Sequence, residues 1–91
     1  MNNKILIELI VPVLEERYDV FIPANRKIGN VIELCSKVVS DLSGGYFIIS
    51  DEIKLYSGVD GSMYDINELV RKTDIRNGSR LILMWGGFNE F

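Results

Sequence analysis

Residues 18–31 read YDVFIPANRKIGNV and contain the change of hydrophobic period that decides the fold. Before Pro23 the residues favour an extended strand with a side-chain period of two, and the proline ends it. After Pro23, apolar residues recur every three or four positions, which predicts an α-helix. The strand residues expected to face the core are Tyr18, Val20 and Ile22, and those expected to face outward are Asp19 and Phe21.

The expected helix continues this pattern to residue 42. Asn25 is its expected N-terminal cap, because a side-chain oxygen there can accept hydrogen bonds from the free N–H groups of the first turn. Residues 43–45, Ser-Gly-Gly, are the expected stop, because glycine tolerates the left-handed conformation beyond a helix end. The predicted core face of the helix is Ile28, Val31, Cys35, Val38 and Leu42.

Upstream, residues 4–11 (KILIELIV) predict a first strand in which Glu8 marks the solvent side. Pro12 ends this strand, and the short polar connection after it predicts an antiparallel hairpin with residues 18–22. The side chains expected in the core are Ile5, Ile7 and Leu9, and those expected on the outer face are Leu6 and Ile10.

Downstream of the helix, residues 46–49 are an apolar crossover to which we assign no structure. The order of all elements predicts an α+β fold in which a four- or five-stranded mixed sheet packs on one long helix. The elements expected after the crossover are a strand at 53–57, a short strand at 62–64, one or two helical turns at 66–73, a turn at Asn77-Gly78 and a last strand at 80–85.

The composition is that of a folded domain and limits the classes of partner that the chain can bind. The 91 residues are 47% hydrophobic and 25% charged, which excludes intrinsic disorder. The net charge of −3 has the wrong sign for a typical nucleic-acid binder, so we expect no nucleic-acid partner. No apolar stretch approaches the roughly 20 residues of a membrane span, and a single cysteine fits a reducing compartment. We therefore expect a soluble cytoplasmic protein without membrane insertion.

The residue types predict no catalytic centre, no metal site and no cofactor. The chain has no histidine, which excludes triads with an imidazole base and histidine-ligated metals. Cys35 lies on the apolar helix face, so we interpret it as core packing rather than as a nucleophile. Asp60 and Asp65 suggest a calcium loop, but counting from Asp60 the EF-hand glycine and glutamate positions hold Asp65 and Arg71. Basic residues near the end of the chain are interpreted as a solvated rim: Arg71, Lys72, Arg76 and Arg80.

The order and spacing of the elements resemble the ubiquitin-like β-grasp fold over residues 4–85. Residues 18–31 are similar to the second strand and helix start of ubiquitin without a gap, and residues 74–83 resemble its closing loop and last strand. Within this superfamily the chain resembles the YukD/EsaB proteins, small bacterial ubiquitin-like components encoded with type VII secretion systems. The likeness is carried by the YD-hydrophobic-x-hydrophobic-P run before the helix and the Ile-x-Asn-Gly-x-x-Leu-x-Leu run at 75–83.

This resemblance implies a single ubiquitin-like domain over residues 1–91, with its core at 4–85 and a short aromatic tail at 86–91. It also implies a non-enzymatic adaptor of a type VII secretion system, whose partner is the ATPase or a membrane component of the machinery. The alternative is a conjugatable or sulfur-carrier modifier, which needs processing at Gly87 because four residues follow it. We interpret Gly86-Gly87 as a turn, because the pair directly follows the last strand and leaves almost no tail for an activating enzyme.

The open face of the predicted sheet is the candidate protein-binding site. Such a face normally alternates to polar residues, so apolar residues gathered there mark a contact surface. In ubiquitin-like folds this face is the usual docking surface. The alternative is that residues 85–91 fold back and cover it. The predicted protein-binding residues are Leu6, Ile10, Phe21, Tyr56, Ile82 and Met84.

Overall fold

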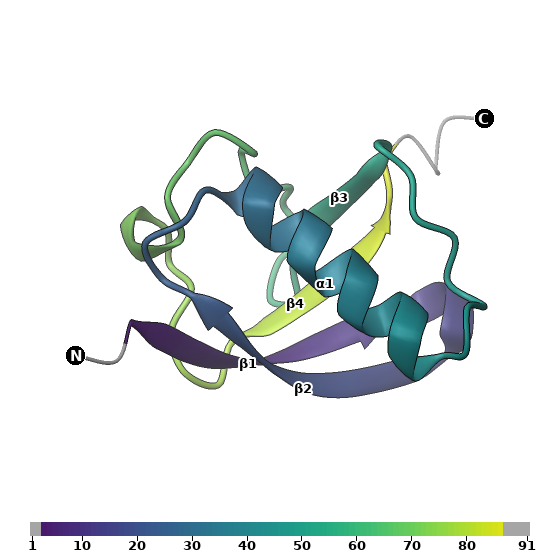
Figure 1. The fold of residues 1–91 in the computed structure, drawn as a ribbon. Helices are drawn as coiled ribbons and strands as arrows, with labels where there is room; N and C mark the ends of the chain where they lie inside the picture. Colours follow the sequence, from purple (N-terminus) through teal and green to yellow (C-terminus); the bar gives the residue numbers. More distant parts are fainter. Residues whose placement is uncertain (1–2, 87–91) are drawn as a thin grey trace.

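A four-stranded mixed sheet packs against one long helix in the computed structural model of the chain, which describes residues 3–86 (Figure 1). The sheet order is β2-β1-β4-β3. This arrangement confirms the predicted α+β fold with a single long helix. The elements are β1 (Lys4–Val11), the 3₁₀ turn η1 (Pro12–Leu14), β2 (Glu16–Pro23), α1 (Ile28–Leu42), β3 (Ile53–Ser57), the 3₁₀ turn η2 (Val70–Lys72) and β4 (Arg80–Trp85).

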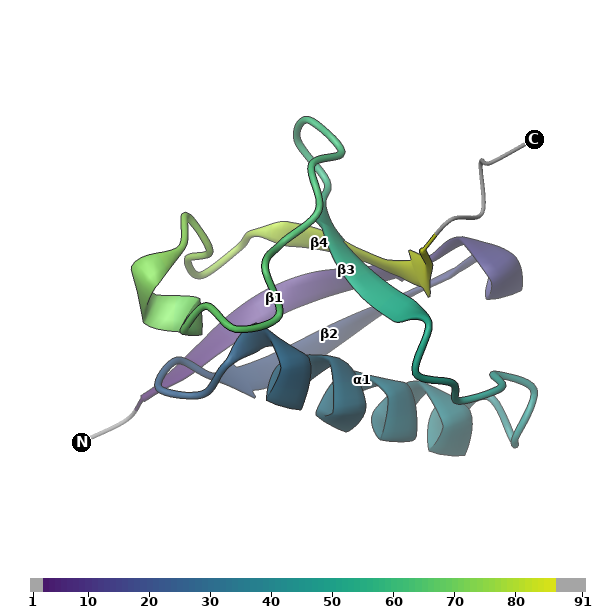
Figure 2. The same ribbon diagram turned by 90° about the horizontal axis from the view of Figure 1, so that it is seen from above.

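The strand pairing gives the sheet one covered face and one open face. β1 pairs antiparallel with β2 and parallel with β4, and β3 pairs antiparallel with β4. Figure 2 shows α1 running along one side of the sheet. The predicted strand directions are confirmed, because the alternate residues Ile7, Leu9 and Ile22 are buried beneath the helix while Leu6 and Phe21 are exposed. The sheet therefore turns its second face away from the only α-helix among residues 3–86.

The buried stripe of the helix differs from the predicted one. Val38 is only half-buried and Leu42 is 63% exposed, so both were wrongly assigned to the core face. Apolar residues also occupy neighbouring positions, so the sequence permits two overlapping stripes, and Val38 lies at the edge of the one that the sheet covers. Leu42 lies in the last turn, where the chain leaves the helix. The buried residues of α1 are Ile28, Val31, Ile32, Cys35, Ser36 and Val39.

The start of α1 is capped by a distant backbone segment rather than by Asn25. The N-cap residue is Lys27, which makes no side-chain capping bond. Instead the Ile28 N–H donates to the Glu68 carbonyl and the Gly29 N–H to the Ile66 carbonyl, each at 2.9 Å. A Cβ at position 29 would lie 3.2 Å from the Ile66 oxygen, so glycine permits this close approach.

Because residues 66–68 cap α1, the predicted helical turns at 66–73 shrink to the 3₁₀ turn η2. The predicted short strand at 62–64 is likewise reduced to a single bridge between Tyr56 and Met63. The carbonyls of Ile66 and Glu68 bind the N–H groups of α1, which leaves fewer of them for helical turns in their own segment.

The crossover after α1 is anchored by one aromatic side chain. Phe47 is 2% exposed and stacks on Trp85, with ring centroids 6.3 Å apart. Its neighbours Tyr46, Ile48 and Ile49 are exposed. Within residues 3–86 no helix combines the length and the apolar character needed to cross a bilayer.

Candidate protein-binding face

All six predicted binding residues lie on the open side of the sheet. They occupy the alternate strand positions whose neighbours point into the core, and Tyr56 takes the expected outward position because Ile53 and Leu55 are buried. Phe21 is 58% exposed and Leu6 is 38% exposed. The other four, Ile10, Tyr56, Ile82 and Met84, are half-buried by their neighbours on the same face.

The strand register brings four of these residues together. Ile10 on β1 lies opposite Ile82 on β4, and Ile82 lies opposite Tyr56 on β3. Met84 follows two positions after Ile82 and so shares its face. We call these four residues, Ile10, Tyr56, Ile82 and Met84, the Ile82 patch. Leu6 and Phe21 face each other across β1 and β2 and form a separate apolar pair.

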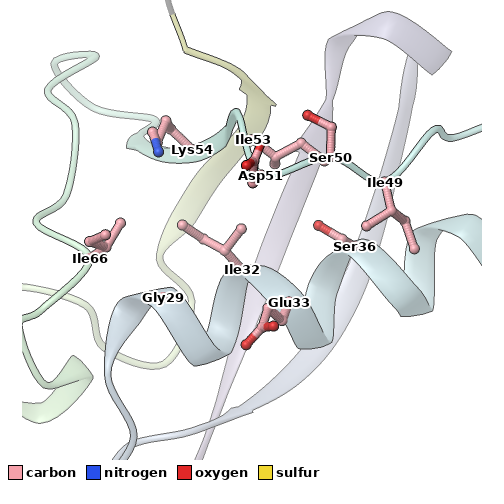
Figure 3. A pocket seen from close by; sticks show the side chains of 10 residues that line it. All are labelled: Gly29, Ile32, Glu33, Ser36, Ile49, Ser50, Asp51, Ile53, Lys54 and Ile66. Carbon is pink, nitrogen blue, oxygen red and sulfur yellow. The ribbon is translucent and has the colours of Figure 1, made fainter.

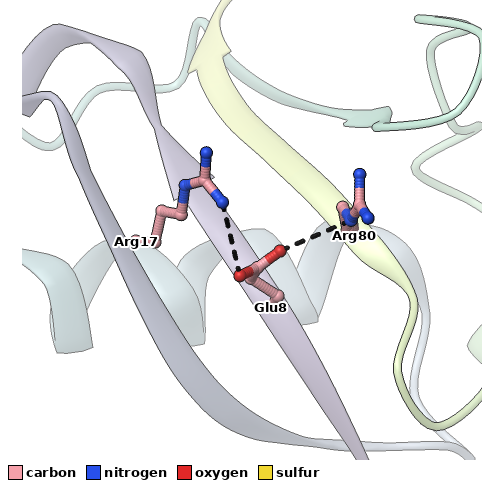
Figure 4. A network of polar contacts seen from close by, with 3 residues as sticks. All are labelled: Glu8, Arg17 and Arg80. Atoms are coloured by element: carbon pink, nitrogen blue, oxygen red, sulfur yellow. Dashed lines mark ion pairs between the residues drawn. The ribbon is translucent and has the colours of Figure 1, made fainter.

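A polar row separates the Ile82 patch from that pair. Glu8 lies opposite Asp19 on one side and Arg80 on the other. One Glu8 carboxylate oxygen is 3.8 Å from Arg17 Nη1 and the other is 3.6 Å from Arg80 Nε (Figure 4). Both arginine side chains are about two-thirds exposed (69% and 67%), so each pair contributes only about 0–1 kcal/mol to stability. The predicted single apolar face is thus divided in two.

Three cations border the Ile82 patch, and sequence reasoning did not include them in the site. Arg17 lies opposite Ile10, Lys54 lies opposite Met84, and Arg80 precedes Ile82 by two positions on the same strand. Arg80 had been interpreted as solvated rim. The register between strands identifies these cations, because it places each of them next to a patch residue on the same face of the sheet. The patch is therefore apolar at its centre and cationic at its border.

Cys35 lies in the core, away from this face. Its side chain is completely buried, and burial raises the pKa of the thiol to about 12. The thiolate, which is the nucleophilic form, is therefore scarce at neutral pH. The interpretation of Cys35 as a core residue is consistent with this environment.

The carboxylates of the suspected calcium loop bind their own backbone. Asp60 Oδ1 accepts hydrogen bonds from the Ser62 N–H (3.0 Å) and the Ser62 hydroxyl (2.8 Å), which lower the pKa of Asp60. Asp65 Oδ1 accepts the Asn67 N–H at 2.9 Å. Within the described residues, no three carboxylate or thiol side chains come together as a metal site would require.

Gly86 extends the β3–β4 pairing by one position. Its N–H donates to the Glu52 carbonyl at 2.7 Å, and a Cβ there would lie only 2.9 Å from Lys54 Cγ. Gly87 and residues 88–91 lie outside the described residues. The predictions that this tail covers the sheet face, or that Gly87 is a processing site, fall on that part of the chain.

The comparisons with known proteins identify the fold. No protein-family model and no curated protein sequence matches the chain. The EccD5 ubiquitin-like domain from Mycobacterium xenopi is 19% identical with a TM-score of 0.75, and the match covers 92% of this chain and 96% of that one. The ubiquitin of Caldiarchaeum subterraneum is 14% identical with a TM-score of 0.65, covering 90% of this chain and 92% of that one.

A chain of the ESX-5 inner membrane complex is also similar, with 17% identity and a TM-score of 0.76. The match covers 92% of this chain but only 21% of that one, so this chain corresponds to about a fifth of that protein. At these identities the comparisons establish the fold. The chain has the ubiquitin-like β-grasp fold, as its order of elements predicts.

Proposed function

We propose that this chain is a non-enzymatic ubiquitin-like adaptor that binds a larger protein through its open sheet face. The observation that carries the proposal is the Ile82 patch, a contiguous apolar row on a face turned away from the helix. Apolar groups gathered on an open sheet face usually mark a contact surface. Leu6 and Phe21 extend the surface beyond the polar row of Glu8.

The proposed partner is the cytoplasmic machinery of a bacterial type VII secretion system, either its ATPase or a membrane component. Support comes from the sequence likeness to the YukD/EsaB proteins and from the structural likeness to the EccD5 domain and to a chain of the ESX-5 complex. The proposal of a non-enzymatic role is supported by the absence of histidine from the sequence and by the burial of Cys35. The protein would act in the cytoplasm by holding its partner.

The proposal is tested with the double variant Ile82→Lys, Met84→Glu. Because both side chains are half-buried and point away from the core, we expect a folded protein destabilised by about 1 kcal/mol. A charge in a docking contact costs a few kcal/mol of affinity, so secretion and co-purification with the partner should both fail. The measurements are circular dichroism, pull-down and a secretion assay.

The matched control is Ile48→Lys, Val59→Glu, which makes similar charge changes at exposed positions outside the sheet face. This control should retain secretion and pull-down. Undiminished secretion and pull-down by the folded Ile82/Met84 variant would contradict the proposal. Intact-mass analysis of the native protein tests the alternative modifier role, since a modifier would have lost residues 88–91.

A further inference from the structure

A groove lies between α1 and β3. It has a volume of about 480 Å³. Figure 3 shows its lining side chains coming from α1, from the stretch that leads into β3, from the start of β3 itself and from the segment that caps the helix. We call it the α1–β3 groove. Lys54, which borders the Ile82 patch, also lines this groove, but none of the four residues of the patch itself does.

The walls of the groove are aliphatic. Ile32 and Ile53 are almost fully buried and form its inner part, whereas Ile49 is 51% exposed and Ile66 is 43% exposed at its sides. Isoleucine side chains left half in water favour an apolar occupant, because its binding would remove that surface from water.

One buried polar group in the wall has no partner. Ser36 is 1% exposed, and its hydroxyl oxygen makes no hydrogen bond to any residue within 3–86. Buried hydroxyls are normally hydrogen-bonded, and a serine within a helix commonly bonds the carbonyl four residues earlier. The groove therefore contains an unmade hydrogen bond beside its aliphatic walls.

The border of the groove is acidic. Glu33 and Asp51 line it, and Asp65 lines an adjoining hollow that shares Lys54 and Ile66 with it. Three carboxylates and one ammonium group thus line these two adjoining hollows, and Lys54 forms no ion pair among the described residues. The border of the Ile82 patch has the opposite balance, with three cations against Glu8. Charge complementarity therefore favours a basic occupant for the groove.

We propose that the α1–β3 groove binds a short basic-aliphatic segment of a partner protein. Aliphatic side chains of that segment pack against the four isoleucines, and a neighbouring lysine or arginine faces Glu33 and Asp51. This site is distinct from the proposed docking through the sheet face and does not depend on it.

The probe is the peptide acetyl-Gly-Lys-Ile-Ile-Lys-Gly-amide, added to the full chain labelled at isoleucine δ1 methyl groups for NMR. We expect saturable shifts at Ile32, Ile49, Ile53 and Ile66, with a dissociation constant on the order of 1 mM. The Ile10 and Ile82 methyl groups on the sheet face serve as internal controls, and their NMR signals should not shift. The same peptide with glutamate in place of lysine should bind at least about fivefold more weakly.

Two variants test the charge argument. Glu33→Lys, Asp51→Lys should reverse the preference, so that the glutamate peptide binds more tightly than the lysine peptide. Glu15→Lys, Glu16→Lys makes the same change of charge at the β1–β2 turn, where both residues are exposed, and should keep the original preference. An Ile10→Lys variant, which places a charge in the Ile82 patch two strands away from β3, should bind the lysine peptide as the unmodified chain does, which separates this inference from the proposed function.

Four results would overturn the proposal. The first is the absence of saturable shifts at the groove isoleucines, and the second is equal binding of the two peptides. The third is a shift of the groove methyl groups on removal of residues 87–91 without peptide, which would assign the groove to the chain itself. The fourth is a shift that depends only on protein concentration, which would assign the groove to a second copy.

Discussion

The sheet face and the α1–β3 groove differ in how the chain builds them. The sheet face comes from regular strands, so the period of two and the register between strands determine which side chains meet there. The groove joins one side of α1 to the start of β3 and to two irregular segments, which no local pattern brings together. One surface is apolar with a cationic border and the other is aliphatic with an acidic border. A small domain can therefore present two chemically opposite surfaces, of which only the regular one is visible in the sequence.

The inner face of α1 supports both surfaces, and its disruption should have the largest effect on stability. Val31 is completely buried, so Val31→Ala should lower the free energy of unfolding by about 2 kcal/mol through lost burial and a cavity. Val38→Ala makes the same change at a half-buried position and should cost less than about 1 kcal/mol. Urea denaturation of the two variants measures the difference, and equal midpoints would show that the buried stripe is centred elsewhere.

This pair of valines also shows what the sequence could not predict about the helix. Both residues are apolar, and both fit a stripe of spacing three or four, so only the sheet decides which faces inward. The capping of α1 by the carbonyls of Ile66 and Glu68 was unpredictable for the same reason, since it joins segments about 40 residues apart.

Strand direction was predictable because one charged residue and two prolines set the parity and the ends of the first hairpin. Glu8 marks the open side, and Pro12 and Pro23 close the two strands. The six outward residues followed from parity alone. Their division into a patch and a pair did not, because it depends on the register across three strands, which places Glu8 opposite Asp19 and Arg80.

The buried Cys35 thiol should make the stability of the protein decrease at alkaline pH. Burial raises the pKa of Cys35 from 9.0 to about 12 in the folded protein, so the unfolded chain loses this proton first. The thiol does not reduce the free energy of unfolding well below pH 9, but this free energy decreases as the pH rises from 9 toward 12. We expect a loss of about 1.4 kcal/mol at pH 10 relative to pH 8.

Cys35→Ala should lower stability at pH 8 through lost packing but remove this part of the alkaline slope. Tyr64 adds a slope of the same sign, because burial and its hydrogen bond to Asp74 raise the pKa of its hydroxyl to about 12. Tyr64→Phe is therefore the second variant to measure by urea denaturation at pH 8 and pH 10. If the free energy of unfolding of Cys35→Ala falls between pH 8 and pH 10 as much as that of the unmodified chain, the alkaline loss does not come from the thiol.

Two buried serines distinguish the groove from the sheet edge. Ser36 has an unpartnered hydroxyl in the groove wall, whereas the Ser57 hydroxyl oxygen accepts the Val59 N–H at 3.1 Å at the end of β3. Removing an unsatisfied buried hydroxyl relieves a desolvation cost, so Ser36→Ala should stabilise the protein by about 1 kcal/mol. Ser57→Ala leaves an N–H without its acceptor and should destabilise it by about 1 kcal/mol. Thermal denaturation measures both, and a shift in the same direction for both would refute this distinction.

The smallest expected effect concerns the polar row that divides the sheet face. Glu8→Gln removes the carboxylate charge from two long, exposed ion pairs, so it should cost only about 0.5 kcal/mol. The loss should vanish in 1 M NaCl, where the Debye length is about 3 Å. Glu68→Gln is the matched control, because the Glu68 side chain forms no ion pair within residues 3–86 and should give no salt-dependent change.

If the Ile82 patch binds its partner independently of Leu6 and Phe21, Glu8→Gln should leave pull-down intact. A variant that folds normally but loses the partner would instead show that the polar row is itself part of the contact.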